Sequence, residues 1–351
     1  MLMSIILDID DVLMDFNDCL VEKLQNEKQF APALSINDIS DWNSSEHPEL
    51  NERFKFLNKD FFLNQQPYAG ACEFVKELSK YCDIFVHTAV YPEYVPERFK
   101  RIVELFPEIN PNHILFGSRK DLSRTTFMLD DNADNILSSN AKIPILMRRP
   151  WNKNLTGLVA ANTYDDVLTI IKSYAKSFVP KNDLNSYDII ALVGPTGSGK
   201  NEIANKMAKE CYYSIPVSYT TKKTQAKRYE HISKTEFFKK RDNGELLEYS
   251  VYGGYYYGLS SKQIEDAEQP IIVPIDITGA FMLRNKYNVA IIYVDCDKEV
   301  LVKNILENNE LLLTEKVNRI LSIDIEMKNK QFADFVVKNG VELKALLEKE
   351  A

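Results

Sequence analysis

The chain has 351 residues, which is long for a single hydrophobic core and predicts two domains. Its hydrophobic content of 45% and charged content of 27% are ordinary for a soluble globular protein. The formal net charge of −8 argues against broad binding to nucleic acids or membrane surfaces, although it leaves room for a local basic patch. No apolar stretch approaches the roughly 20 residues that a membrane span requires.

The N-terminus and the cysteines favour a cytoplasmic location. The first apolar run has no basic segment before it and ends in acidic residues, which predicts a strand rather than a signal peptide. The five cysteines are scattered and lack metal-ligand spacing, so we expect free thiols in a reducing compartment.

The first half alternates short apolar runs with amphipathic helical patterns, which predicts an α/β fold with parallel strands covered by helices. Residues 16–66 interrupt this alternation and are rich in aromatic residues, so we expect a small helical cap over the carboxyl edge of the sheet. The expected strands are residues 4–7, 83–87, 113–116, 126–129 and 144–147. The expected helices are residues 16–26, 49–57, 70–80 and 97–105.

The second half begins after a stretch without apolar periodicity. Residues 176–187 are largely polar and contain Pro180, which predicts a linker. A strand at residues 189–193 then opens a second alternating series, and no internal repeat relates it to the first. We therefore predict two different α/β domains, residues 1–175 and 188–351, joined by the linker.

The first predicted strand ends in a pair of carboxylates, Asp8 and Asp10. Ligands of open α/β sheets gather at the carboxyl ends of the strands. Two carboxylates at such a place can bind Mg²⁺, with one as a nucleophile toward phosphorus and the other as an acid and base. The alternative is that these acidic residues simply end the strand.

Polar residues also follow three later predicted strands. Thr88 offers a hydroxyl and a backbone N–H to a phosphate oxygen, and Lys120 can neutralise the phosphate and the attacking carboxylate. Asp130 and Asp131 would complete the Mg²⁺ shell. Each residue alone has an ordinary structural explanation, but four such features in order after four strands favour a catalytic site.

This order of residues resembles the haloacid dehalogenase superfamily of phosphohydrolases, and within it the 5′(3′)-deoxyribonucleotidases. The resemblance covers about residues 1–175. The stretches that carry it are Asp8-Ile-Asp10, Asp60-Phe-Phe-Leu, Ile84-Phe-Val-His-Thr88, and Lys120 followed by Asp130-Asp131.

The resemblance implies a haloacid-dehalogenase-like core with a cap and a phosphoaspartate mechanism. Asp8 would attack the phosphate, while Asp10 would protonate the leaving nucleoside oxygen and then activate water. Mg²⁺ would neutralise charge at this site. The residues implied to hold Mg²⁺ are Asp8, Asp10, Asp130 and Asp131.

The cap supplies aromatic candidates for contact with a nucleobase. The family places aromatic cap residues around the base, so Phe61, Phe62 and Trp42 are candidates. The core of a small cap is an equally good explanation for all three. Residues 149–152 fit the loop after the last strand and can also approach the substrate.

A glycine-rich loop lies between an apolar strand and the predicted helix 201–211, which is the context of a phosphate-binding loop. Its glycines let backbone N–H groups wrap the phosphates, and Lys200 reaches the β and γ oxygens. Asn201 stands where Ser or Thr usually provides a hydroxyl to Mg²⁺, and an amide oxygen can bind Mg²⁺ or its water. The expected ATP-binding residues are Gly194, Thr196, Gly197, Ser198, Gly199, Lys200 and Asn201.

The residues from about 188 to 340 resemble guanylate kinase. The resemblance implies a P-loop kinase fold in which Ser218 and Glu248 read the guanine edge, while Tyr229 and Tyr257 hold the acceptor phosphate. Asp276 would lie at a strand end near metal and substrate. The motifs that carry the resemblance are the glycine-rich loop, Ser218-Tyr-Thr-Thr221, Asn243-Gly-Glu-Leu-Leu-Glu248 and Tyr255-Tyr-Tyr-Gly258.

Several positions of the second half depart from the family pattern. Lys222 and Gln225 replace two phosphate-binding arginines, and the lid keeps Arg319 as the nearest arginine. Because lid arginines stabilise the transferring phosphoryl group, the base specificity and the rate stay open. The basic residues that can substitute, unless they form a solvated face, are Lys227, Arg228, Lys239 and Arg241.

The two phosphate-handling motifs together predict a bifunctional enzyme of deoxynucleotide metabolism. A Mg²⁺-dependent 5′-nucleotidase would act on one monophosphate, and a kinase would transfer phosphate from ATP to another. Identical specificities would only consume ATP, so we expect different base preferences. The expected partners are nucleoside monophosphates and ATP, without membrane or nucleic acid, and the oligomeric state is left open, a homodimer included.

Two alternatives remain open at this point. A polynucleotide end-repair enzyme also pairs a P-loop kinase with this phosphatase superfamily, but its basic channel is disfavoured by the acidic charge. The other alternative is an active nucleotidase fused to a degenerate kinase fold that binds nucleotide without transferring phosphate. Asn201, Gln225 and the arginine-poor lid favour this alternative. Lys200, Ser218 and Glu248 oppose it.

Overall fold

The computed structural model describes residues 3–27, 35–39, 47–153, 155–176, 184–223, 228–252, 254–309 and 311–348. The chain divides into two compact units. The N-terminal unit comprises Met1–Lys153 and Val159–Leu168, and the C-terminal unit comprises Asn154–Leu158 and Thr169–Ala351. Both units are α/β, as predicted, whereas the predicted limits at residues 175 and 188 stay a prediction. No helix in the described ranges has the length and apolar character to cross a membrane.

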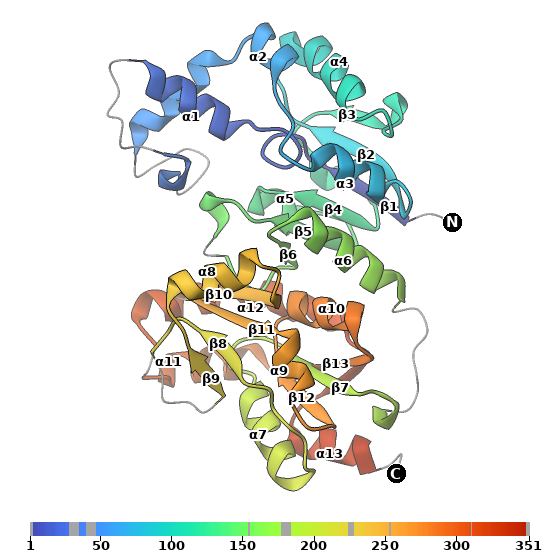
Figure 1. Cartoon of the computed structure of the whole chain (residues 1–351), viewed down its shortest axis with the longest axis vertical. Helices are drawn as coiled ribbons and strands as arrows, with labels where there is room; N and C mark the ends of the chain where they lie inside the picture. The colour runs from blue at the N-terminus through green and yellow to red at the C-terminus, as the bar shows by residue number, and fades with distance from the viewer. Residues whose placement is uncertain are drawn as a thin grey trace. The chain divides into compact units, whose positions relative to one another are not determined.

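The N-terminal unit is built on a six-stranded parallel sheet with the order β3-β2-β1-β4-β5-β6 (Figure 1). Its central strand β1 is apolar because it is covered on both faces, and Ile5 and Leu7 are fully buried. The five predicted strands are confirmed to within one residue, and β6 was too short to leave a pattern. The strands are β1 (Met3–Leu7), β2 (Cys82–Thr88), β3 (Ile114–Phe116), β4 (Phe127–Asp130), β5 (Ile143–Met147) and β6 (Ala160–Ala161).

Helices of the N-terminal unit cover this sheet and form the cap past the strand ends (Figure 1). The cap consists of α1, the 3₁₀ helix Pro48–Phe56 and α2, around a core that includes Phe16, Leu20 and two phenylalanines of α2. Residues 49–57 were expected in a helix, and the structure forms it with 3₁₀ geometry. The α-helices are α1 (Asn17–Asn26), α2 (Lys59–Asn64), α3 (Ala71–Leu78), α4 (Val95–Leu105), α5 (Ala133–Ser138) and α6 (Tyr164–Lys176), which runs into the C-terminal unit.

The C-terminal unit holds a parallel sheet with the order β12-β7-β13-β14 and a mixed sheet with the order β10-β11-β8-β9. The mixed sheet was not predicted from the sequence. The strands are β7 (Ile189–Val193), β8 (Ser218–Thr220), β9 (Tyr229–His231), β10 (Leu246–Tyr252), β11 (Tyr255–Ser260), β12 (Ile271–Pro274), β13 (Val289–Val294) and β14 (Phe335–Val337). The helices are α7 (Lys200–Glu210), α8 (Lys234–Asp242), α9 (Ser261–Glu265), α10 (Ile277–Lys286), α11 (Lys298–Glu307), α12 (Leu313–Lys328) and α13 (Gly340–Glu348).

Candidate active sites

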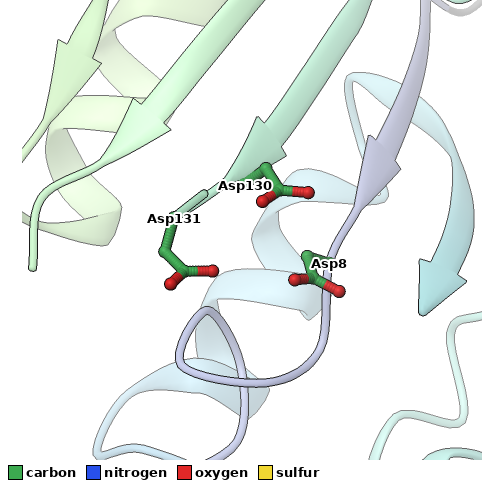
Figure 2. A group of neighbouring side chains, drawn as sticks. All are labelled: Asp8, Asp130 and Asp131. Carbon is green, nitrogen blue, oxygen red and sulfur yellow. The ribbon is translucent and has the colours of Figure 1, made fainter. Parts of the chain in front are cut away.

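Three buried carboxylates meet at the carboxyl edge of the N-terminal sheet. Asp8 follows β1, while Asp130 ends β4 and Asp131 follows it, and these strands are adjacent and parallel. Their ligand atoms all lie within 4.8 Å of one another. Figure 2 shows the three carboxyl groups around a shared space beside the strand ends. Because neighbouring parallel strands end at the same edge, the backbone alone brings these residues together.

Lys120 lies between two of these carboxylates. Its Nζ atom is 2.8 Å from Asp8 Oδ1 and 2.7 Å from Asp130 Oδ2, and its side chain is buried. Burial opposes the positive charge, but Asp8 and Asp130 outweigh it and raise the pKa of Lys120. Burial also raises the pKa of Asp8, against the opposing charge of Lys120. Lys120 is therefore a permanent cation beside the proposed nucleophile.

Thr88 ends β2, the other neighbour of β1, and its side chain is completely buried. Its Oγ1 atom has no hydrogen-bond partner in the part of the chain that the structure describes. An unpaired buried hydroxyl lowers the free energy of unfolding by roughly 1–3 kcal/mol, so such a group usually has a functional role. A phosphate oxygen at the strand ends would provide the missing partner.

The Asp10 carboxylate lies apart from this group, although the sequence analysis placed it in the Mg²⁺ shell. Arg98 Nη2 donates to both of its oxygens, at 2.7 and 2.9 Å, and Gln65 Nε2 donates at 3.0 Å. Asp10 is not among the three carboxylates whose ligand atoms lie within 4.8 Å of one another. Burial raises the pKa of Asp10, against the opposing charge of Arg98. Neither Arg98 nor Gln65 belongs to a sequence motif, and neither was predicted.

Asp11 anchors the cap to the loop after β1, and the sequence analysis missed this role. It adopts a φ of 55°, is completely buried and accepts from the backbone N–H groups of Phe16 and Asn17 at 3.2 and 2.9 Å. The Asn17 side chain in turn accepts from Arg53 Nε at 2.8 Å. Burial raises the pKa of Asp11 to about 7. The sequence signal that could have indicated this role is that Asp11 is a third acidic residue, directly after the Asp8-Ile-Asp10 motif.

The cap aromatics that were predicted to contact a base are part of the cap core. Phe61 and Phe62 are buried and meet edge to face, with ring centroids 5.2 Å apart. Phe62 also stacks on Tyr94 at 5.0 Å. This agrees with the packing role that the sequence left open, and the base contact stays a prediction. Trp42 lies outside the described residues.

The three carboxylates fit a divalent cation. Burial and then the charge of Asp130 raise the pKa of Asp131 well above its ordinary value, because negative charges are gathered out of water. A hard cation prefers such oxygen ligands and would remove this repulsion. Trp151 Nε1 donates to Asp131 Oδ2 at 2.9 Å and orients this carboxylate, so the 149–152 loop contacts the group, and its approach to the substrate stays a prediction.

We expect Mg²⁺ to stabilise the N-terminal unit through these carboxylates. At a concentration of about 100 times Kd, it should raise the thermal midpoint of this unit by roughly 5–10 °C. Asp131→Asn should abolish the shift. The exposed Asp60→Asn should keep it, and an equal shift in both variants would place the cation elsewhere. The measurement is a calorimetric scan with and without Mg²⁺.

In the C-terminal unit, the glycine-rich loop joins β7 to α7 and wraps back on itself. Gly197 and Gly199 have φ angles of 86° and 82°, which favour glycine, and a Cβ at Gly194 would lie 2.7 Å from Val294 O. Lys200 Nζ donates to Gly194 O at 2.5 Å and to Pro195 O at 2.9 Å. Burial lowers the pKa of Lys200, against the charges of Glu326 and Asp276.

Glu326 of α12 holds one backbone group of this loop. Its Oε2 atom accepts from the N–H of Thr196 at 2.7 Å, and its Oε1 atom accepts from Ser322 at 2.6 Å. The hydroxyl of Ser198 is buried and without a partner among the described residues. No sequence signal pointed to Glu326, because it lies 130 residues beyond its partner.

Asn201, the unusual last residue of the loop, is the partner of Arg228. Arg228 Nη1 donates to Asn201 Oδ1. The Arg228 guanidinium also lies over the ring of Tyr229, 4.6 Å from its centroid. One guanidinium therefore contacts both the residue predicted to end the glycine-rich loop and a residue predicted for the acceptor phosphate. Lys227 and Gln225 lie outside the described residues, Lys239 is exposed and Arg241 pairs with Asp242.

The predicted acceptor residues gather on the mixed sheet. Ser218 of β8 pairs in register with Tyr229 of β9, and the rings of Tyr229 and Tyr257 are 5.5 Å apart. Glu248 lies on β10, where burial and then the charge of Asp276 raise its pKa well above its ordinary value. Asp276 caps α10 by accepting from the Gly279 N–H at 2.7 Å. Lys222 Nζ lies 5.7 Å from the ring centroid of Tyr255.

Residues 2–178 match the family model described as 5′ nucleotidase, deoxy (pyrimidine), cytosolic type C protein, over about half of the chain. The chain belongs to this nucleotidase family. Residues 186–348 match the guanylate kinase family model. Both resemblances predicted from the sequence are thereby confirmed. The chain combines a nucleotidase domain with a guanylate kinase domain, and it is an enzyme of nucleotide metabolism with phosphohydrolase and nucleoside monophosphate kinase parts.

Individual proteins and solved structures are similar to parts of the chain. Guanylate kinase of Clostridium tetani is 29% identical over 170 residues, which cover 43% of this nucleotidase-family chain and 82% of the relative. The structure of guanylate kinase from Anaplasma phagocytophilum covers 47% of this chain and 87% of its own, at 21% identity and a TM-score of 0.35. A haloacid dehalogenase-like hydrolase from Streptococcus pneumoniae covers 48% and 97%, at 11% identity and a TM-score of 0.31.

Proposed function

We propose that the N-terminal domain hydrolyses the 5′-phosphate of a deoxynucleoside monophosphate through a phosphoaspartate, and that the C-terminal domain phosphorylates a different monophosphate with ATP. The observation that carries the first activity is the Asp8 carboxylate at the end of β1, paired with Lys120 beside Asp130 and Asp131. The second activity rests on the glycine-rich loop and Lys200. We propose domain limits at 1–175 and 188–351, and a cytoplasmic site of action.

The hydrolytic step would use Asp8 as the nucleophile. One of its oxygens attacks phosphorus, the bond from phosphorus to the nucleoside oxygen breaks, and the Asp10 carboxyl gives its proton to that oxygen. The raised pKa of Asp10 supports this role because it favours the protonated form. Asp10 then accepts a proton from the water that attacks the phosphoaspartate, and phosphate leaves Asp8.

The other residues of this site would stabilise the charge that develops on phosphorus oxygens. Lys120 supplies a fixed cation, and the unpaired Thr88 hydroxyl is free to donate to a phosphate oxygen. Asp8, Asp130 and Asp131 would hold Mg²⁺, which when bound neutralises phosphate charge. We propose that Phe61, Phe62 and Trp42 of the cap approach the nucleobase.

The kinase reaction would be positioned by two sets of residues. Lys200 and the loop N–H groups would hold the ATP phosphates, and the Asn201 amide would approach the metal of the nucleotide. On the acceptor side, Ser218 and Glu248 would bind the base. The residues proposed for the acceptor phosphate and its metal are Lys222, Tyr229, Tyr257 and Asp276.

We expect Arg228 to supply positive charge to the transferred phosphoryl group, because it contacts both the loop and Tyr229. Arg228→Gln should lower kcat of the kinase on the order of 100-fold, with a smaller change in KM for ATP. Arg241→Gln on α8 is the matched control and should stay near the wild-type rate. If kcat falls equally in both variants, Arg228 has only a structural role. The readout is ADP release in a coupled assay.

Different base preferences would make the two activities productive together. If both domains acted on one monophosphate, they would form a cycle that only hydrolyses ATP. The test is a panel of deoxynucleoside monophosphates, each incubated with the full chain with and without ATP. Phosphate release from one base and ADP formation with another supports the proposal. A shared best substrate overturns the difference in preference, and activity on an oligonucleotide 3′-phosphate alone overturns the proposed substrate class.

A further inference from the structure

The Asp10 carboxylate is held by the cap and by α4 rather than by the sheet. Gln65, the residue that ends cap helix α2, donates to Oδ1 at 3.0 Å. Arg98 of α4 donates to both oxygens, at 2.7 and 2.9 Å, and its side chain is fully buried. The position of this carboxylate is therefore set by two side chains from outside the loop that carries it.

These two donors are themselves tied to the aromatic part of the cap. The Arg98 guanidinium lies over the ring of Phe62, 4.8 Å from its centroid, and Phe62 also belongs to α2. Arg101, one turn further along α4, donates from Nε to the backbone oxygen of Gln65 at 2.8 Å. A shift of α2 therefore changes the surroundings of Asp10 by two routes, through Gln65 directly and through Phe62 and Arg98.

We propose that Arg98 and Gln65 are positioning residues that couple occupancy of the cap by a nucleobase to the placement of Asp10 for proton transfer. This inference rests on the proposed hydrolysis of nucleoside monophosphates. A base held by the cap fixes α2, and with it Gln65, Phe62 and Arg98, and the carboxylate is then placed to protonate the nucleoside oxygen as its bond to phosphorus breaks. A phosphate ester without a base does not fix α2 and Arg98, so the Asp10 carboxylate is not held in place for proton transfer.

The test compares esters that differ in their need for a proton. The leaving oxygen of a deoxynucleoside 5′-monophosphate needs the proton of Asp10, whereas p-nitrophenolate leaves without one. Arg98→Met should lower kcat on the nucleotide by on the order of 100-fold and leave hydrolysis of p-nitrophenyl phosphate within a few-fold of wild type. Gln65→Met should act in the same direction, and Arg98→Lys should recover part of the loss.

The cap coupling has a separate readout. In the wild type, the nucleotide should be hydrolysed faster than deoxyribose 5-phosphate, which has the same leaving oxygen but no base. In Arg98→Met this ratio of kcat values should fall toward one. An unchanged ratio would overturn the coupling.

Arg53→Met is the matched control, because Arg53 is equally buried and lies 4.1 Å from the ring centroid of Phe54, yet donates to Asn17 and Leu50. It should change both esters by the same factor. If Arg98→Met also slows both esters equally, Arg98 is a structural residue and the inference fails. If the wild type hydrolyses neither ester, it is the proposed function that fails.

Discussion

Asp8→Asn should reduce phosphate release from nucleoside monophosphates by on the order of 10⁴-fold or more. The amide keeps the size of the side chain but cannot attack phosphorus. It also removes the negative charge that pairs with Lys120 at 2.8 Å. Because the loss falls on the chemical step, kcat should fall while the protein stays folded. The measurement is inorganic phosphate released by the full chain in the presence of Mg²⁺.

The same variant carries its own control in the C-terminal domain. ADP formation from ATP and an acceptor should stay within about twofold of wild type, because the kinase uses none of the residues around Asp8. Phosphate release that persists at the wild-type rate would show that another group is the nucleophile. A parallel loss of both activities would point to misfolding instead, and circular dichroism separates that case.

Lys200→Met should reduce phosphoryl transfer from ATP by on the order of 10³-fold. The lysine ammonium is the cation of the glycine-rich loop, where it lies 2.5 and 2.9 Å from two loop oxygens, and we expect phosphate oxygens to replace them when ATP binds. We expect the loss in an Asp8→Asn background, in which product hydrolysis does not obscure the assay. Lys206→Met, on the same helix and paired with Glu210, is the matched control.

The outcome also decides between an active kinase and a binding module. An active kinase requires that ADP formation depend on Lys200. ATP consumption that is absent in the parent protein, or unaffected by Lys200→Met, contradicts the kinase proposal. Retained binding of ATP by the inactive protein would then support the degenerate fold that the sequence left open.

The strand-end residues could be predicted because their positions follow from topology. Asp8, Thr88 and Asp130 each come at the end of a strand, and parallel neighbours deliver their ends to one edge. Local sequence around each strand was therefore enough to place them. The glycine-rich loop was predictable for the same reason, since its strand, turn and helix are contiguous in the chain.

The hydrogen-bond partners of other side chains could not be predicted from the local sequence, because they lie far away in the chain. Asp10 was assigned to the metal group by the family resemblance, whereas in the structure its carboxylate accepts from Arg98, 88 residues away. Glu326 reaches Thr196 across 130 residues, with no motif around either contact. Arg228 was one of four basic candidates, and the contact with Asn201 singles it out. Such pairings depend on how helices pack, which periodicity does not encode.

The place of β1 in the sheet has a consequence for synthesis of the chain on the ribosome. Strand β1 is made before both of its neighbours in the sheet, which are β2, starting at Cys82, and β4, ending at Asp130. Until those segments have emerged, Ile5, Ile6 and Leu7 form an apolar strand with both edges unpaired, which is a state prone to aggregation. We therefore expect the nascent N-terminal domain to need shielding, by chaperones or by the ribosome itself, from the synthesis of Leu7 until Asp130 has emerged.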